Sequence, residues 1–272
     1  MDVAEEVAAD LAAEQDALDA VVARLSPEQW QTPTPSPGWT VTDQIGHLTY
    51  FDGTATLAMS DAEAFLRHRH ELLQSFSDAG AVEAATLAGY RAMEPDLLLA
   101  TWREGRAQLG AAAAAVPADA RIEWYGPSMS KRSFLTARLM EAWAHGQDVV
   151  DAVDGNRPPT DRLRHVAQLG VITRGWSYKN RGLDVPAGDV RVELGAPSGE
   201  VWTWGADDAV DSITGPAEDF CLVATQRRHV DDTRLTLNGA LAREWMELAQ
   251  AFAGPATTKP ASTRPTSRGA SA

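Results

Sequence analysis

The segment Asp154–Pro159, with the sequence DGNRPP, constrains the fold more than any other part of the chain. A glycine and two adjacent prolines interrupt helices and strands alike, so a structural boundary is expected here. Before it, apolar residues recur with the period of a helix; from Val190 they alternate as in strands. The sequence therefore predicts an α+β protein, with a helix bundle in residues 1–155 and a small α+β domain in residues 156–254.

The helical region is predicted to contain four principal helices. They are expected at residues 2–25, 41–59, 82–116 and 131–153, with a shorter helical piece at 62–76. Pro95 interrupts or restarts the third of them. The link TPTPSPGWT after the first helix cannot be helical, and RIEWYGPSMS reads as a loop or a short extended piece. Four amphipathic helices joined in this way are typical of a bundle.

The second region, residues 156–254, contains segments with the apolar period of a helix and segments with the alternation of a strand. A helix is expected at about 161–178, followed by three short antiparallel strands in VRVEL, EVWTW and AVDSITG. Two further helices are predicted, at 215–224 and 239–253. The tail, residues 255–272, has almost no large apolar side chains and cannot offset its ordering entropy, so we expect it to be disordered.

Charge and composition exclude several classes of function. The chain of 272 residues has a formal net charge of −14, which disfavours nucleic acid and anionic membranes as partners. The first residues lack the features of a signal peptide, and no apolar run approaches a membrane span, so a cytoplasmic protein is expected. The single cysteine, Cys221, excludes an intramolecular disulfide and lies in the apolar run FCLVA, where a buried, inert thiol is favoured.

Two predicted helices carry potential metal ligands. Glu141, His145 and Asp148 are spaced by four and three residues on the helix at 131–153, so they share one stripe of it. His47 on the helix at 41–59 is the obvious third ligand beside Glu141 and His145. Two imidazoles and one carboxylate suit a zinc ion with an open coordination position, although iron, nickel or manganese could occupy the same set.

The sequence leaves the roles of several other polar and aromatic residues open. Asp148 could orient an imidazole or meet a substrate; alternatively it forms an N–H to carboxylate pair or a charge at the mouth of the bundle. Trp39 is expected to pack the loop near that mouth, where it would contact a bound cofactor. His68 and His70 are two residues apart, point to different sides of a helix, and are interpreted as solvated.

Two stretches together resemble the DinB-like, mycothiol-dependent maleylpyruvate isomerase family of actinobacteria. They are SPGWTVTDQIGHLTYFD and MEAWAHGQDVV, which match the family's histidine segment and its later E-x-x-x-H-x-x-D segment. The run SITGPAEDFCLVATQRRHVDDTRLTLNGALAREWMELA resembles the same family's sterol-carrier-like C-terminal domain. The resemblance implies a divalent metal on His47, Glu141 and His145.

The resemblance also implies that an arginine of the second domain reaches the cleft. Arg227 and Arg228 are the candidates, and either would pair with a substrate carboxylate. The alternative is that both are surface charges near Asp231 and Asp232.

The function predicted on this basis is that of a metal-dependent enzyme that uses a low-molecular-weight thiol, mycothiol. The thiol would be transferred to a small electrophilic or unsaturated substrate, or would add and leave again in a cis–trans isomerisation. Two alternatives remain: a metal-binding protein without turnover, and a metal-dependent hydrolase with Asp148 as general base. The protein would be a monomer or a homodimer, and its partners would be these small molecules.

Overall fold

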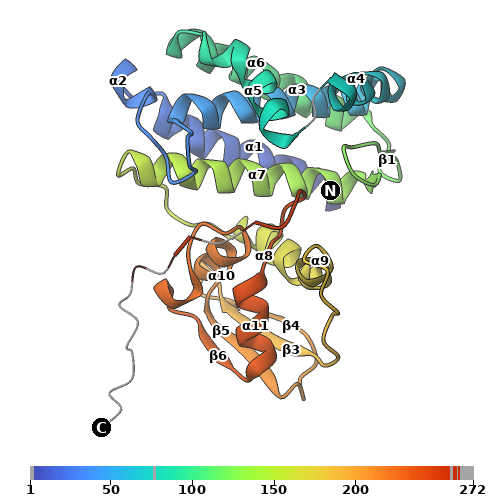
Figure 1. Cartoon of the computed structure of the whole chain (residues 1–272), viewed down its shortest axis with the longest axis vertical. Coiled ribbons are helices and arrows are strands. Elements are labelled where there is room, and N and C mark those ends of the chain that lie inside the picture. The colour runs from blue at the N-terminus through green and yellow to red at the C-terminus, as the bar shows by residue number, and fades with distance from the viewer. Residues whose placement is uncertain (1–2, 76–77, 258–259, 262, 264–272) are drawn as a thin grey trace. The chain divides into compact units, whose positions relative to one another are not determined.

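The computed structural model describes residues 3–75, 78–257, 260, 261 and 263, and the chain divides into two compact units. The first unit is Met1–Arg157 and the second is Pro158–Ala272. The division between them falls inside the segment DGNRPP. An α+β fold, with a helical unit followed by a smaller mixed unit, agrees with the prediction (Figure 1).

The first unit is built around four long helices. Its elements are α1 (Val3–Val22), α2 (Pro27–Trp30), α3 (Val41–Ser60), α4 (Ala62–Ser75), α5 (Ala79–Arg91), α6 (Pro95–Ala115), β1 (Arg121–Ile122), β2 (Met129–Ser130) and α7 (Lys131–Ala152). Helix α3 packs on α6 and α7, and α1 packs on the same two helices. The predicted helix at 82–116 is two helices, because Pro95 begins α6 and the residues before it leave the helical conformation.

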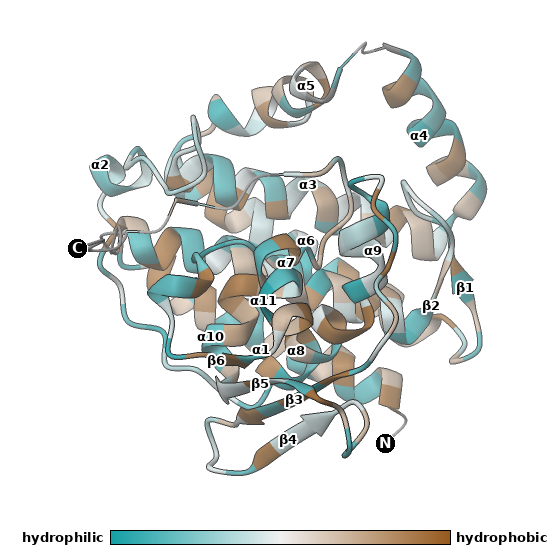
Figure 2. Cartoon of the chain, turned by 60° about the horizontal axis from the view of Figure 1, so that its bottom comes forward, coloured by the Kyte–Doolittle hydropathy of each residue, from teal (hydrophilic) through white to brown (hydrophobic). Residues whose placement is uncertain are grey.

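Two short helices lie outside the four-helix core and contact α3. They are α4 and α5, whose ribbons alternate between teal and brown in Figure 2, as expected for helices that are apolar on one side only. The segment between α6 and α7 forms the antiparallel pair β1 and β2, with Ile122 opposite Met129. This pair is the short extended piece allowed by the sequence RIEWYGPSMS.

A charged pair is buried in the centre of the first unit. Arg138 of α7 donates from Nη2 to Asp52 of α3 over 2.8 Å, and Gln15 of α1 donates to the same carboxylate over 3.0 Å. Asp52 is 1% exposed and Arg138 is 4% exposed. Burial raises the pKa of Asp52 despite the opposing charge of Arg138. These three side chains join α1, α3 and α7 through a network that periodicity could not predict.

The second unit contains a four-stranded sheet and four helices within the described residues. Its elements are α8 (Leu163–Ile172), α9 (Arg174–Lys179), β3 (Val190–Gly195), β4 (Val201–Trp204), β5 (Asp211–Pro216), α10 (Ala217–Ala224), a 3-10 turn (Val230–Asp232), β6 (Thr236–Asn238) and α11 (Ala240–Leu248). The strand order is β4-β3-β5-β6. Helix α10 packs on α8, and α11 contacts β5, β6 and α9.

Several predictions for this unit need correction. The strands are not all antiparallel, because β5 pairs with β3 in parallel while β4 occupies the opposite edge of β3. The alternation of apolar and polar residues predicts where strands occur but not their order in the sheet. Strand β6 was not predicted, and the last helix ends at Leu248 rather than at residue 253. The predicted helix at 161–178 is divided into α8 and α9 at Thr173.

The predicted tail falls only partly within the described residues; residues 258, 259, 262 and 264–272 lie outside them. Thr257 donates from its hydroxyl to Gln226 over 2.6 Å, and its carbonyl accepts from Arg181 over 2.8 Å. The ordered part of the second unit therefore continues at least to Thr257. Among the described helices, none is long and apolar enough to cross a membrane.

Cys221 lies inside α10 and is fully buried. Burial raises the pKa of its thiol well above the usual value, and Sγ contacts the carbonyl oxygen of Leu163 at 3.6 Å. We therefore expect the folded protein to react with Ellman's reagent far more slowly than the same protein in denaturant. We also expect Cys221→Ser to keep full activity; loss of activity would reopen a mechanism through the protein's own thiol.

Candidate metal centre

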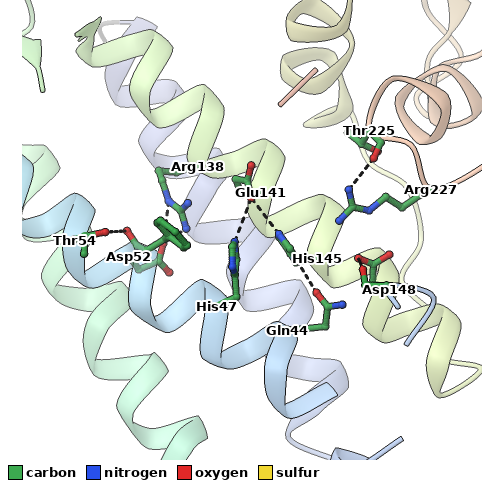
Figure 3. A network of polar contacts seen from close by, with 12 residues as sticks. Gln44, His47, Asp52, Thr54, Arg138, Glu141, His145, Asp148, Thr225 and Arg227 are labelled. Carbon is green, nitrogen blue, oxygen red and sulfur yellow. Dashed lines mark hydrogen bonds and ion pairs between the residues drawn. The ribbon is translucent and has the colours of Figure 1, made fainter. Parts of the chain in front are cut away.

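Three side chains converge between α3 and α7, as Figure 3 shows: His47, Glu141 and His145. Oε2 of Glu141 lies 3.1 Å from Nε2 of His145 and 3.6 Å from Nε2 of His47. The three potential ligand atoms all lie within 4.8 Å of one another. The structure thus brings together the three residues that the sequence predicted as metal ligands.

Local sequence explains why both helices present these residues. Thr40 caps α3 through a capping box with Asp43, which fixes the start of the helix at Val41. Ser130 caps α7 in a similar way by accepting from the backbone N–H of Ser133. On α7, Glu141 and His145 are four residues apart and therefore lie over one another.

Burial and mutual contact set the charges of this group. Desolvation, reinforced by the charge of His145, lowers the pKa of His47 from its usual value of 6.5 to about 4. Burial alone would raise the pKa of Glu141, but hydrogen bonds and charges from both histidines hold it well below its usual value. At neutral pH the site therefore offers a carboxylate and at least one neutral imidazole, which are the forms that bind metal ions.

Gln44 is a site residue that the sequence prediction missed. Its amide nitrogen donates to the Thr34 hydroxyl over 2.9 Å, so its oxygen faces Nδ1 of His145 at 2.5 Å. An amide oxygen only accepts hydrogen bonds, so Nδ1 must carry the proton. A metal-binding histidine is commonly held in this way by a second residue. The position of Gln44, three residues before His47 on α3, was the available signal.

We expect Gln44→Leu to weaken zinc binding about 10- to 100-fold, because nothing then selects the Nδ1–H form of His145. Gln108→Leu on the exposed side of α6 is the matched control and should leave zinc affinity unchanged. Competition with a chromophoric chelator measures both affinities. Equal affinities in the two variants would remove Gln44 from the site.

The Pro-rich link after α2 places Trp39 on the histidines. The Trp39 ring stacks on His145 at 5.8 Å between centroids with an interplanar angle of 18°, and lies 5.2 Å from His47. Gly38 has φ of +81°, which allows the turn, and the backbone N–H of Thr34 donates to the Trp39 carbonyl. Nε1 of Trp39 donates to Glu83 of α5 over 2.8 Å. Trp39 therefore covers the imidazoles, beyond the loop packing expected of it.

The remaining predicted residues have different environments. Asp148 is buried one turn beyond His145 and accepts a hydrogen bond from Ser36 over 3.1 Å, so it is tied to the link that carries Trp39. Arg227 and Arg228 follow α10 in the second unit, where Arg227 donates to the carbonyl of Thr225 over 2.7 Å. Their approach to the ligands stays a prediction.

The interpretation of His68 as solvated is wrong. His68 is half-buried, and its Nε2 lies 2.9 Å from the Tyr50 hydroxyl and 3.4 Å from the Tyr125 hydroxyl. His70, by contrast, is exposed, as predicted. Contacts of His68 with α3 and with the β1–β2 connection could not be read from the local pattern of α4.

A second group of potential ligands lies in the second unit and consists of His229, Asp231 and Glu247. Nδ1 of His229 already accepts from the backbone N–H of Asp231 over 3.1 Å. Arg243 binds the Asp231 carboxylate at 2.7 Å and lies 3.6 Å from Glu247. A cation thus already neutralises these carboxylates, so this group is interpreted as a network of ion pairs.

Comparisons with known proteins identify the family of the first unit. Residues 11–150 match the family model described as the mycothiol maleylpyruvate isomerase N-terminal domain. Residues 186–238 match a second one, described as wyosine base formation. The predicted sterol-carrier likeness of the second unit therefore stays a prediction.

Similar whole proteins are also known. Two proteins from two strains of Mycobacterium tuberculosis, both named only as uncharacterized, are 45% identical over 254 residues, which is 91% of this chain and 95% of theirs. The crystal structure of the mycothiol-dependent maleylpyruvate isomerase is similar in fold, with a TM-score of 0.55 and 15% identity over 84% of this chain and 90% of that chain. A histidine-to-alanine mutant of that enzyme gives a TM-score of 0.56 and 15% identity over 85% and 91%.

Proposed function

This chain belongs to the family defined by the mycothiol maleylpyruvate isomerase N-terminal domain, and from this premise we propose that it is a metal-dependent enzyme that uses mycothiol. The proposed reaction is addition of the thiol to a small electrophilic or unsaturated substrate. It ends either in S-transfer or in cis–trans isomerisation with release of the thiol. The metal would be zinc, held by His47, Glu141 and His145.

The observation that carries this proposal is that three potential ligand atoms face one another in the site. Because Nδ1 of His145 faces the oxygen of Gln44, its Nε2 is the nitrogen left to bind a metal, and this Nε2 lies 3.1 Å from a carboxylate oxygen of Glu141. Each of these side chains offers a lone pair to a metal ion in its metal-binding form. A tetrahedral zinc ion with bonds of about 2.05 Å separates its ligands by roughly 3.3 Å. The distances of 3.1 and 3.6 Å from Glu141 to the two histidines bracket this value.

Three protein ligands leave one tetrahedral position for a fourth. A zinc ion held there would supply a positive charge that keeps a bound thiol in its thiolate form at neutral pH. The chain has one cysteine, Cys221, and its buried thiol cannot serve as the nucleophile. A small thiol from solution is therefore the sulfur nucleophile that this proposal requires.

Other residues of the chain would hold the reactants. Trp39 stacks on His145 and would form one wall of the space beside it. Ser36 and Asp148 fix the link that carries Trp39. We propose that Arg227 or Arg228 of the second unit pairs with a substrate carboxylate, as the family resemblance suggests. The parallel hydrogen bonds of a guanidinium suit such a group.

The test is dependence on thiol. Purified, zinc-loaded protein is incubated with maleylpyruvate, and separately with chlorodinitrobenzene, each with and without mycothiol, and products are followed by absorbance and mass spectrometry. The proposal expects turnover with mycothiol only. Turnover without any thiol would support a hydrolase, and the absence of turnover with every thiol and electrophile supplied would support a binding protein.

A further inference from the structure

A cluster of phenol and imidazole groups lies beside the metal ligands and has no assigned role. Tyr50 of α3, Tyr125 of the β1–β2 connection and His68 of α4 meet at Nε2 of His68, with contacts of 2.9 and 3.4 Å. One imidazole nitrogen has either one hydrogen or one lone pair, so it can bond fully to only one of the two hydroxyls. Tyr125 also forms side-chain hydrogen bonds with Tyr50 and with Thr54, so the cluster is a network of hydroxyl groups around one imidazole nitrogen.

This cluster is one helical turn from the metal ligands. Tyr50 follows His47 by three residues on α3, a rise of about 4.5 Å along the helix. The ring of Phe51 connects the two places, because it lies 4.5 Å from the ring of His47 and 5.7 Å from the ring of Tyr125. A molecule of a few carbon atoms bound at the metal could thus reach these hydroxyls along an aromatic wall.

The segment that carries Tyr125 is packed against other aromatic rings. Trp124, next to Tyr125, stacks on the buried ring of Phe65 at 5.5 Å and meets Phe134 edge-on at 5.0 Å. Its carbonyl accepts from Arg69 of α4 over 2.6 Å. Tyr50, Tyr125 and His68 themselves are only half-buried, so a ligand from solution can reach them. Hydrogen-bond donors that are positioned by packing and remain accessible are what a binding site for a developing negative charge needs.

The protonation of the two phenols also favours an electron-rich ligand. Burial raises the pKa of Tyr50 and of Tyr125, so both phenols keep their protons and stay hydrogen-bond donors at neutral pH.

We propose that the hydroxyls of Tyr50 and Tyr125, oriented by His68, bind the carbonyl or carboxylate oxygen of a small conjugated acid that is the electrophilic substrate. This inference rests on the proposed function and deepens it. When the thiolate sulfur bonds to the β carbon, the electron pair of the C=C bond moves to the carbonyl oxygen, where the two phenols donate to it. Rotation about the former double bond, now single, and return of the electron pair from the oxygen re-form the C=C bond and break the C–S bond, which releases the same thiolate, so no further reactant is needed.

The test is calorimetric titration of the full-length, zinc-loaded protein with maleate, a small unsaturated dicarboxylate, in the absence of thiol. We expect Tyr50→Phe and Tyr125→Phe each to weaken maleate binding about tenfold, the loss for a hydrogen bond to a charged acceptor. Tyr178→Phe in the second unit removes a buried hydroxyl and is the matched control, with unchanged affinity. Zinc content and mycothiol affinity should be the same in all four proteins.

Two outcomes would overturn the inference: equal maleate affinities in all four proteins, or no maleate binding to the wild type at millimolar concentration. Neither result would contradict the proposed function as a thiol-dependent metal enzyme. If none of the proteins holds zinc while their maleate affinities still differ as expected, the metal-dependent function fails and the oxygen-binding role of the tyrosines stands. His68→Gln, which keeps one hydrogen-bonding group, should bind maleate more tightly than His68→Leu.

Discussion

Replacing Glu141 by alanine is expected to weaken zinc binding by more than about 100-fold and to abolish thiol-dependent turnover, since loss of a residue that merely supports a ligand already costs about 10- to 100-fold. Glu141 is shared by both histidines, at 3.1 and 3.6 Å. Without it the two imidazoles have no anionic partner at the site. Zinc content after dialysis and competition with a chelator measure the effect.

The control for this change is Glu104→Ala, which removes an exposed carboxylate from α6. It should retain one equivalent of zinc and full activity. Glu141→Gln keeps an oxygen of similar reach but loses the charge, so its affinity should fall between that of Glu141→Ala and that of the wild type. If Glu141→Ala held zinc as tightly as the wild type, the three-ligand site would be wrong.

The largest change in stability is expected for Arg138→Met. The substitution leaves the carboxylate of Asp52 buried without its cation, which costs about 3–5 kcal/mol in the free energy of unfolding. Asp52 and Arg138 are 1% and 4% exposed, so water cannot replace the lost partner without opening the bundle. Urea denaturation of the first unit, followed by circular dichroism, measures the loss.

Arg103→Met is the matched control, because the pair of Arg103 with Asp19 is largely exposed on the arginine side. Its cost should stay within about 1 kcal/mol. The double variant Asp52→Leu and Arg138→Met should recover most of the stability lost in Arg138→Met, because no buried charge is left unpaired. A double variant as unstable as Arg138→Met would show that the packing of Arg138, and not its charge, stabilises the bundle.

Sequence reasoning predicted the local parts of this protein well, for physical reasons. Helical periodicity depends on one face of each helix being buried, so α1, α3 and α7 lie close to their predicted ranges. The pair Glu141 and His145 is also local, because a spacing of four residues places both on one side of α7. Conversely, Gly215 and Pro216 marked the start of α10 but could not reveal that β5 runs parallel to β3.

The features that the sequence could not give are contacts between distant segments. Gln44 orients His145 from another helix, Trp39 stacks on His145 from the Pro-rich link, and His68 meets two tyrosines from α3 and the β1–β2 connection. Each depends on how helices pack, which the pattern of a single helix does not contain. His47 was predicted in advance because the third ligand had to come from a second helix and because the family resemblance implies a ligand at this histidine.

The most direct test of the central claim is zinc content combined with the state of the thiol. Elemental analysis of the purified wild type and of His47→Ala is followed by replacing zinc with cobalt and adding mycothiol. The account predicts about one equivalent of metal in the wild type, its loss in His47→Ala, and a thiolate-to-cobalt charge-transfer band on adding mycothiol. A wild type that takes up no metal even after reconstitution, or cobalt protein whose spectrum mycothiol leaves unchanged, would contradict it.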